Sequence, residues 1–240
     1  MIKLMIVGRR RGGMTVAQLH QYMTDVHGAM VVRFIGESPE ECPKRYVQNH
    51  VFDSTTLIPD GSTDPFTSSR DFVTQVWFDS PMQAKAALDA PLYRQHLQPD
   101  EDNFVDQSSV VKLPVAEQKL FDSGSADARY KVFIFHRHTT QGVAADAASE
   151  TLAHWQTLLA RDEHGIEQWV RNTVMGPPNA TPPINCVDEV WLKTEAAARA
   201  LCVQWQVVAG TATPNPLAAT TSSFTLLAYE HILFGGKPAQ

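Results

Sequence analysis

The chain has 240 residues, 43% of them hydrophobic, which is enough to bury one shared core or two modest ones. Its 20 Lys and Arg residues against 26 Asp and Glu residues give a formal charge of -6, which repels a nucleic-acid backbone. We therefore expect no nucleic-acid partner. The first residues lack the order of a signal peptide and no apolar run is long enough to span a membrane, so we expect a cytoplasmic protein without a membrane partner.

The first half of the chain alternates predicted strands and helices. An apolar, β-prone run predicts a strand over 2–7, and two glycines then break the chain before Thr15, a residue typical of a helix N-cap. Hydrophobic residues at three- and four-residue steps predict a long helix over about 15–35. The same rules predict strands over 45–52, 71–79 and 104–113, and a helix over 81–92. The predicted order is β-α-β-β-α-β.

The second half repeats this order. Residues 130–137 resemble residues 2–9, His164-Gly165 matches His27-Gly28, and Trp191 matches Trp77. The patterns predict strands over 130–137, 168–175, 187–193 and 224–234, and helices over about 148–162 and 195–208. Because the matched segments keep their order, we expect a fused tandem repeat. We predict domains over 1–114 and 129–240, joined by a linker over 115–128.

The repeated order predicts the fold class. A β-α-β-β-α-β unit typically folds as a four-stranded antiparallel sheet with both helices on one face, so its other face needs a cover. A second unit supplies that cover. We predict an α+β protein in which two fused ferredoxin-like β-α-β-β-α-β domains form an intramolecular dimeric α/β barrel. Two separate domains are the alternative, and pairing of the fused chain into a homodimer stays open.

An ordered set of motifs runs through the first half: Thr15-x-x-x-Leu19-x-x-Tyr22-x-x-x-x-His27-Gly28, then Tyr46-Val47-Gln48, Pro91-Leu92-Tyr93 and the acidic run from Asp100 to Asp106. In this order the motifs resemble the EthD family of the dimeric α/β-barrel superfamily. The resemblance implies relatives that include cofactor-free isomerases, cyclases, dehydratases, decarboxylases and small monooxygenases acting on aromatic or lactone compounds. The second half lacks the acidic run, so any function of that run is expected in one half only.

Two matched histidines are candidate catalytic residues. His27 and His164 each precede a glycine near the end of a predicted helix, where the helix dipole favours a protonated imidazole. An imidazole titrates near neutral pH and suits general acid/base catalysis. The alternative role is to cap the terminal carbonyls of the helix.

Strand residues complete the candidate site. Tyr46, Gln48 and His50 alternate and therefore share one sheet face, where we expect Tyr46 and His50 to act in catalysis and Gln48 to bind substrate. A solvated strand face is the alternative. Trp77, Phe104 and Trp191 are predicted to provide flat apolar walls for a planar substrate, although aromatic residues on strands also form cores.

A metal or cofactor is not expected. His136 and His138 share a strand face, with His231 as a distant third ligand, and this is a weaker alternative site for zinc or iron. The three cysteines form no CxxC pair and are interpreted as buried free thiols. Haem, known in some barrel relatives, has no recognisable signature.

The candidate residues support three functions. The first is a cofactor-independent lyase or isomerase that acts on an aromatic or polyketide-like small molecule by dehydration, decarboxylation or lactone rearrangement, with His27 as the general acid/base. The second is a non-catalytic small-molecule binding or accessory protein. The third is a cofactorless monooxygenase. Each predicts a small-molecule partner.

Overall fold

The computed structural model describes residues 1–56, 70–137, 165–176, 184–211 and 224–235. These residues group into two compact units. Unit 1 comprises Met1–Phe52, Ser68–Ala116 and Tyr229–Gln240, and unit 2 comprises Asp53–Thr67 and Glu117–Ala228. The predicted helix over 148–162 lies outside the described residues. The domain bounds predicted at 114 and 129 stay a prediction.

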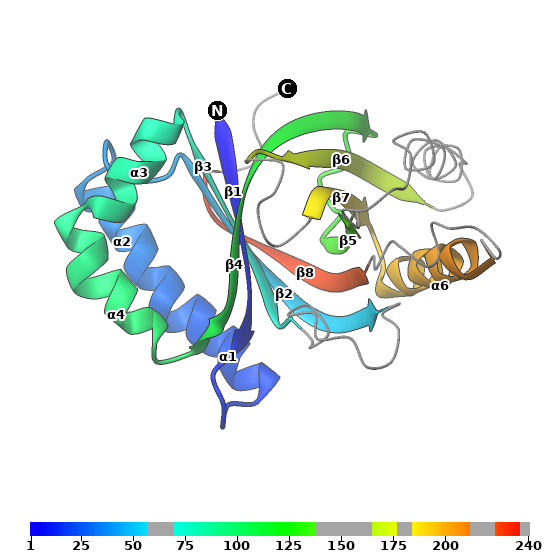
Figure 1. Ribbon diagram of the computed structural model, residues 1–240, viewed down its shortest axis with the longest axis horizontal. Coiled ribbons are helices and arrows are strands. Elements are labelled where there is room, and N and C mark those ends of the chain that lie inside the picture. Colours follow the sequence, from blue (N-terminus) through cyan, green and yellow to red (C-terminus); the bar gives the residue numbers. More distant parts are fainter. Residues whose placement is uncertain (57–69, 138–164, 177–183, 212–223, 236–240) are drawn as a thin grey trace. The chain divides into compact units, whose positions relative to one another are not determined.

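The first part of the chain contains four strands and the helices between them. In chain order, these elements are β1 (Ile2–Arg10), α1 (Val16–Tyr22), η1 (Met23–Gly28), α2 (Ala29–Glu37), β2 (Arg45–Thr56), β3 (Phe72–Phe78), α3 (Pro81–Asp89), η2 (Tyr93–Leu97), α4 (Gln98–Glu101) and β4 (Val105–Asp122). Strand β4 continues through Asp122 and so includes residues predicted as linker. Within unit 1, the helices lie on one side of strands β1 and β3 (Figure 1).

The remaining described elements are β5 (Tyr130–Arg137), β6 (Ile166–Val174), β7 (Ile184–Leu192), α6 (Glu195–Thr211) and β8 (Phe224–Phe234). Buried charges join the strands of unit 2. Asp188 accepts two hydrogen bonds from Arg171, from Nε at 2.9 Å and from Nη2 at 3.0 Å. Lys131 forms an ion pair with Glu189 at 3.2 Å. Because each buried charge has a partner, the desolvation of these groups is compensated within unit 2.

The predicted fold class is wrong. The described strands form one closed barrel in the order β1-β3-β2-β8-β5-β7-β6-β4, with few helices, and not a fusion of two ferredoxin-like domains. The reason lies in the last strand of each half: β4 hydrogen-bonds with both β1 and β6, and β8 with both β2 and β5, so neither half keeps a sheet edge of its own. Hydrophobic periodicity identifies strands, but it carries no information on which strands lie beside one another.

A π-helical turn interrupts the predicted helix over 15–35. The helix begins at Thr15, whose side chain accepts a hydrogen bond from the Gln18 amide at 3.2 Å in a capping box. After the seven residues of α1 it changes to the π-helix η1 and then continues as α2. Buried residues of these three segments, including Leu19, Met23 and Phe34, face the core of unit 1. A π-turn changes the direction of the side chains that follow it, and it is frequent at functional sites.

Gly28 ends the π-turn in a close contact. A Cβ atom there would lie 2.6 Å from the Met23 carbonyl oxygen and 2.7 Å from Leu233 Cδ1. We therefore expect Gly28→Ala to lower the free energy of unfolding by about 1–3 kcal/mol through overpacking. Gly36→Ala is the matched control, because a Cβ atom on Gly36 has nothing within 4 Å, and we expect it to be stabilising by about 0.4–1 kcal/mol. Urea denaturation measures both, and equal stabilities would contradict the packing argument.

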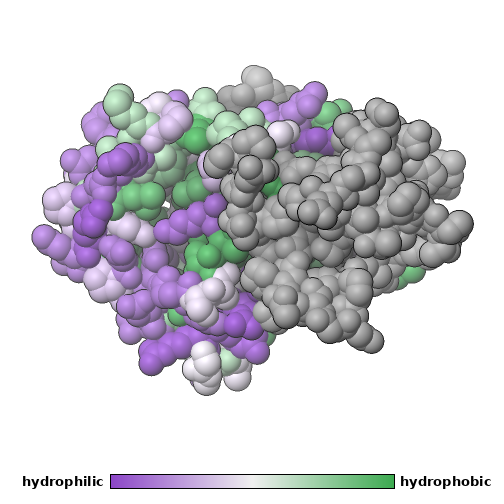
Figure 2. Space-filling view, in the orientation of Figure 1, coloured by the Kyte–Doolittle hydropathy of each residue, from purple (hydrophilic) through white to green (hydrophobic). Residues whose placement is uncertain are grey.

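None of the helices in the described part of the chain is long and apolar enough to cross a membrane. On unit 1, hydrophobic residues appear as green patches among hydrophilic side chains (Figure 2).

Candidate active site

A cavity of about 120 Å³ lies in unit 1 between the sheet and the helices that cover it. Strand residues Leu4, Ile6, Thr74, Val76 and Phe78 form one wall. The opposite wall comes mainly from α2, α3 and η2, and the lining is mostly apolar. A cavity of about 150 Å³ admits a benzene ring, so the size and polarity of this cavity suit one aromatic ring.

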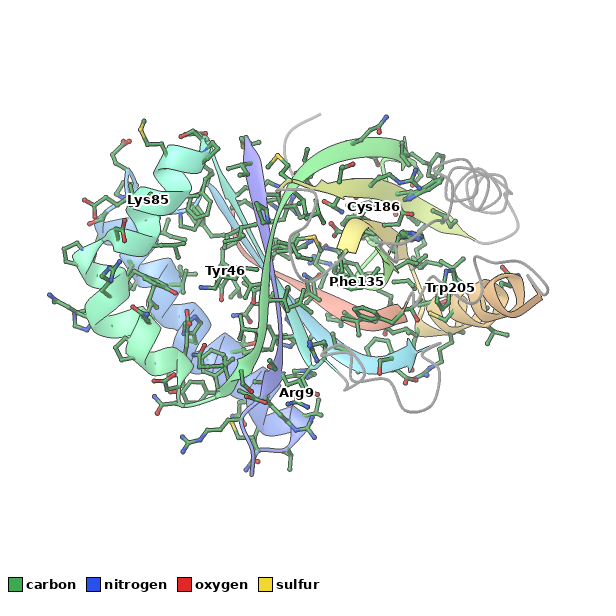
Figure 3. All side chains as sticks on the ribbon, in the orientation of Figure 1. Arg9, Tyr46, Lys85, Phe135, Cys186 and Trp205 are labelled. Carbon is green, nitrogen blue, oxygen red and sulfur yellow. The ribbon has the colours of Figure 1, made fainter. Side chains whose placement is uncertain are left out.

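The strand register explains which side chains reach the cavity. Tyr46 pairs with Val76 and Leu4 also pairs with Val76, so these three side chains project from the same sheet face. Figure 3 shows Tyr46 in the layer between the sheet and the helices of unit 1. Trp77 follows Val76 and therefore points to the opposite face, where the Lys3 ammonium lies 4.9 Å from its ring centroid.

His27 is the polar residue that η1 directs into the cavity wall. Its Nδ1 lies 2.9 Å from Asp100 Oδ2, and both residues are only 9% exposed. A carboxylate at Nδ1 fixes the proton on that nitrogen and leaves the lone pair on Nε2. In the described part of the chain, the His27–Asp100 bond is the only hydrogen bond of this imidazole. The pair therefore has the geometry of a general base held by a carboxylate.

The environment of Asp100 keeps this carboxyl group ionised. Burial raises its pKa, but hydrogen bonds from Tyr22, His27 and Asn103 outweigh burial and lower the pKa below its ordinary value. Tyr22 donates to Oδ1 at 2.6 Å and Asn103 Nδ2 donates to the same oxygen at 3.2 Å. Asp100 is thus a charged, fully oriented partner for His27 at neutral pH.

Tyr46 and Gln48 form the second polar group of the site. Tyr46 is 2% exposed, lines the cavity and accepts a hydrogen bond from Gln48 Nε2 at 2.7 Å. Burial raises the pKa of Tyr46, so its hydroxyl stays protonated. His50 lies on the same strand face, with Nε2 3.2 Å from Gln48 Oε1.

His50 belongs to a stack of imidazoles. Its ring centroid lies 4.4 Å from that of His20 and 4.2 Å from that of His231. Burial, together with the neighbouring His231 and His20 rings, lowers the pKa of His50 to about 3. His50 is therefore neutral at physiological pH, and its Nε2 faces an amide oxygen, which only accepts hydrogen bonds. The role of His50 in catalysis stays a prediction.

Two further polar groups line the cavity. Tyr93 donates a hydrogen bond to Glu101 Oε1 at 2.9 Å, and burial raises the pKa of Tyr93 above its ordinary value. Burial also raises the pKa of the Cys42 thiol. Cys42 is therefore a protonated, weakly polar part of the wall and not an activated nucleophile.

The structure brings some of the predicted residues together and separates others. His27 and Tyr46 line the cavity, Gln48 and His50 connect to Tyr46, and Phe104 packs against His27 with ring centroids 4.9 Å apart. Trp77 does not reach the cavity. Trp191 lies in a core cluster of unit 2 with Ala128 and Val170, beneath the Lys131 ammonium. His164 lies outside the described residues.

Among the described residues, His136 lies beside Asp188 but in no group of three metal-binding side chains. His138 lies outside the described residues, and His136 Nε2 is 2.9 Å from Asp188 Oδ2. Across the described ranges, no group of three or more His, Cys, Asp or Glu side chains is arranged to hold a metal ion. The expectation of a protein without metal or cofactor stays a prediction.

Sequence reasoning missed the partner of His27. Asp100 lies 73 residues further along the chain, in the acidic run that formed part of the family resemblance. Tyr22 and Tyr93 were also quoted within those motifs without a role. The presence of Asp100, His27, Tyr22 and Tyr93 together in one ordered set of motifs was the available signal, and in the structure all four lie at the same site.

Comparison with protein families identifies one family over part of the chain. Residues 11–108 match the EthD domain. The resemblance predicted from the motifs is thereby confirmed for this part of the chain, which contains both His27 and Asp100. No curated protein matches the sequence.

Solved structures share the fold over nearly the whole chain. An anthrone oxidase-like protein is similar with a TM-score of 0.62 and 12% identity, covering 99% of this chain and 94% of that one. A dye-decolorizing peroxidase from Bacteroides thetaiotaomicron is similar with a TM-score of 0.54 and 9% identity, covering 95% of this chain and 92% of that one. At these identities the likeness shows the fold.

Proposed function

We propose that this protein is a cofactor-independent oxygenase that acts on an electron-rich aromatic small molecule, with His27 as the general base. The observation that carries the proposal is the His27–Asp100 pair in the wall of an apolar cavity. Such a base removes a proton from an acidic C–H or O–H group and leaves an electron-rich anion in a site with few polar groups.

The reaction balances without an added reductant. For a CH₂ group activated by an aromatic ring, His27 takes one proton, and the resulting carbanion gives its electrons to O₂. One oxygen atom becomes the new carbonyl oxygen. The other oxygen leaves as water with the two hydrogens of the CH₂ group. The substrate is oxidised and dioxygen is reduced, so the residues of this chain need only bind, orient and deprotonate the substrate.

Two observations favour the oxygenase over the lyase or isomerase. The cavity lining is mostly apolar, which suits O₂ as a co-substrate, and Glu101 is engaged by Tyr93 rather than available to protonate a leaving hydroxyl. The anthrone oxidase-like protein shares the fold over 99% of this chain. The lyase or isomerase would use the same base, so the two functions differ in whether oxygen is consumed.

An oxygen electrode tests the proposal directly. We expect the purified protein to consume O₂ with at least one member of a panel that contains resorcinol, 1-naphthol and anthrone. With ¹⁸O₂, one labelled atom enters the product. Conversion of a substrate without oxygen uptake would instead indicate a lyase or isomerase. Retained binding with no conversion would indicate a binding protein. Mass spectrometry of natively purified protein tests for a bound cofactor.

A further inference from the structure

A chain of hydrogen bonds with one fixed direction runs from His50 to the cavity. His50 Nε2 is 3.2 Å from Gln48 Oε1, and Gln48 Nε2 donates both to the Met23 carbonyl oxygen at 2.7 Å and to the Tyr46 oxygen at 2.7 Å. Both amide protons of Gln48 are therefore used. An amide oxygen in their place would face the Met23 carbonyl oxygen, which has no proton to donate.

The π-turn supplies the group that sets this direction. Met23 is the first residue of η1, and its carbonyl accepts from Gln48. Gly28, at the end of η1, leaves room for the amide, because a Cβ atom there would lie 3.1 Å from Gln48 Nε2. Because a carbonyl oxygen only accepts hydrogen bonds, Gln48 is held in the orientation that turns its amide nitrogen towards Met23.

The orientation of Gln48 determines the role of the Tyr46 hydroxyl. Its oxygen already accepts a hydrogen bond from Gln48, so its own proton is left to donate, and no acceptor for it lies within hydrogen-bonding distance among the described residues. Tyr46 lines the cavity opposite helices that contribute His27, Tyr93 and Glu101. His27 presents an acceptor nitrogen to the same cavity. The cavity wall thus holds a hydrogen-bond donor, Tyr46, and a base, His27, for a ligand.

We propose that Tyr46 donates a hydrogen bond to a carbonyl oxygen of the substrate, and that Gln48 and His50 are positioning residues that hold Tyr46 as a donor. The proposal rests on the proposed function and names its substrate class, an aryl ketone with an acidic C–H group conjugated to the carbonyl. The C–H bond breaks, its proton moves to His27 Nε2, and the electron pair delocalises onto the carbonyl oxygen. The resulting enolate oxygen is held by the Tyr46 hydroxyl.

A matched pair of ligands tests the donor in the absence of O₂, so that no oxidation of the ligand takes place. Acetophenone has a carbonyl oxygen that only accepts hydrogen bonds, and α-methylstyrene has the same shape without that oxygen. NMR titration of the full chain gives the Kd of each ligand. Because a hydrogen bond contributes roughly 1 kcal/mol, we expect Tyr46→Phe to raise the Kd of acetophenone about fivefold. The Kd of α-methylstyrene should stay within about twofold of the wild-type value.

Variants of Gln48 and His50 test the direction of the hydrogen bonds from His50 through Gln48 to Tyr46. Gln48→Glu is nearly isosteric, but its carboxylate accepts the hydrogen bond that the Tyr46 hydroxyl would give to the ligand. The Kd of acetophenone should therefore rise as it does in Tyr46→Phe. His50→Leu should weaken the binding of acetophenone. His50→Gln keeps a donor near the Nε2 position and should restore the wild-type affinity. Equal effects of Tyr46→Phe on both ligands, or unchanged acetophenone binding in Gln48→Glu, would overturn the proposal. Oxygen uptake by the wild-type protein with a phenol that lacks a carbonyl group tests the proposed function separately.

Discussion

Replacement of Asp100 by asparagine is expected to lower kcat by about 10⁴-fold, the size of effect seen when a carboxylate that orients a catalytic histidine becomes an amide. The asparagine amide donates to Nδ1, so the proton of neutral His27 moves to Nε2 and the cavity loses its base. Steady-state oxygen uptake measures the loss. Asp102→Asn is the matched control, because Asp102 is exposed and makes no side-chain contact with His27.

The effect of Asp100→Asn on the stability of the fold is expected to depend on pH. Because the pKa of Asp100 is lowered in the folded state, its carboxylate stabilises the fold above its unfolded pKa of about 3.9, and this contribution is lost as the pH falls through the folded value. Thermal unfolding should therefore show the difference between wild type and Asp100→Asn at neutral pH, and the difference should shrink in acid. A kcat within about tenfold of wild type would contradict the role of Asp100.

Replacement of His27 by alanine is expected to lower kcat by about 10²–10⁴-fold, because the deprotonation step loses its base. Binding of a non-reacting aromatic ligand should be largely retained, since the apolar walls are unchanged. His96→Ala is a suitable control, because His96 is an exposed histidine outside the cavity that packs on Phe34. Unchanged turnover in His27→Ala, with His96→Ala also active, would exclude His27 as the base.

Individual strands could be predicted from the sequence, but the closure of the sheet into a barrel could not. The predicted strands over 45–52 and 224–234 correspond to β2 and β8, because alternating or β-prone runs reflect the pleat of a strand. The partners of β4 and β8 depend on hydrogen bonds between segments far apart in the chain. The π-turn of η1 was also hidden, since a one-residue change in helical period leaves the apolar pattern almost intact.

Local sequence patterns also predicted part of the candidate site, but not the contacts between distant segments. Alternation placed Tyr46, Gln48 and His50 on one face, and the structure joins them by hydrogen bonds. It also separates Tyr46 from Trp77, because Arg45 is the residue that pairs with Trp77. Asp100 could not be assigned to His27 from spacing, because the contact depends on how η1 and α4 pack in three dimensions.

The two π-helical segments have a consequence for how such a site arises. η1 carries His27, and η2 carries Tyr93 and Leu97, so each contributes side chains to the cavity wall. A π-turn contains one more residue than an α-turn, and a single-codon insertion is enough to create one. The candidate site can therefore be gained or lost in evolution while the strands stay unaltered. A relative with a one-residue gap within 23–28 is expected to keep the barrel and to lack the chemistry.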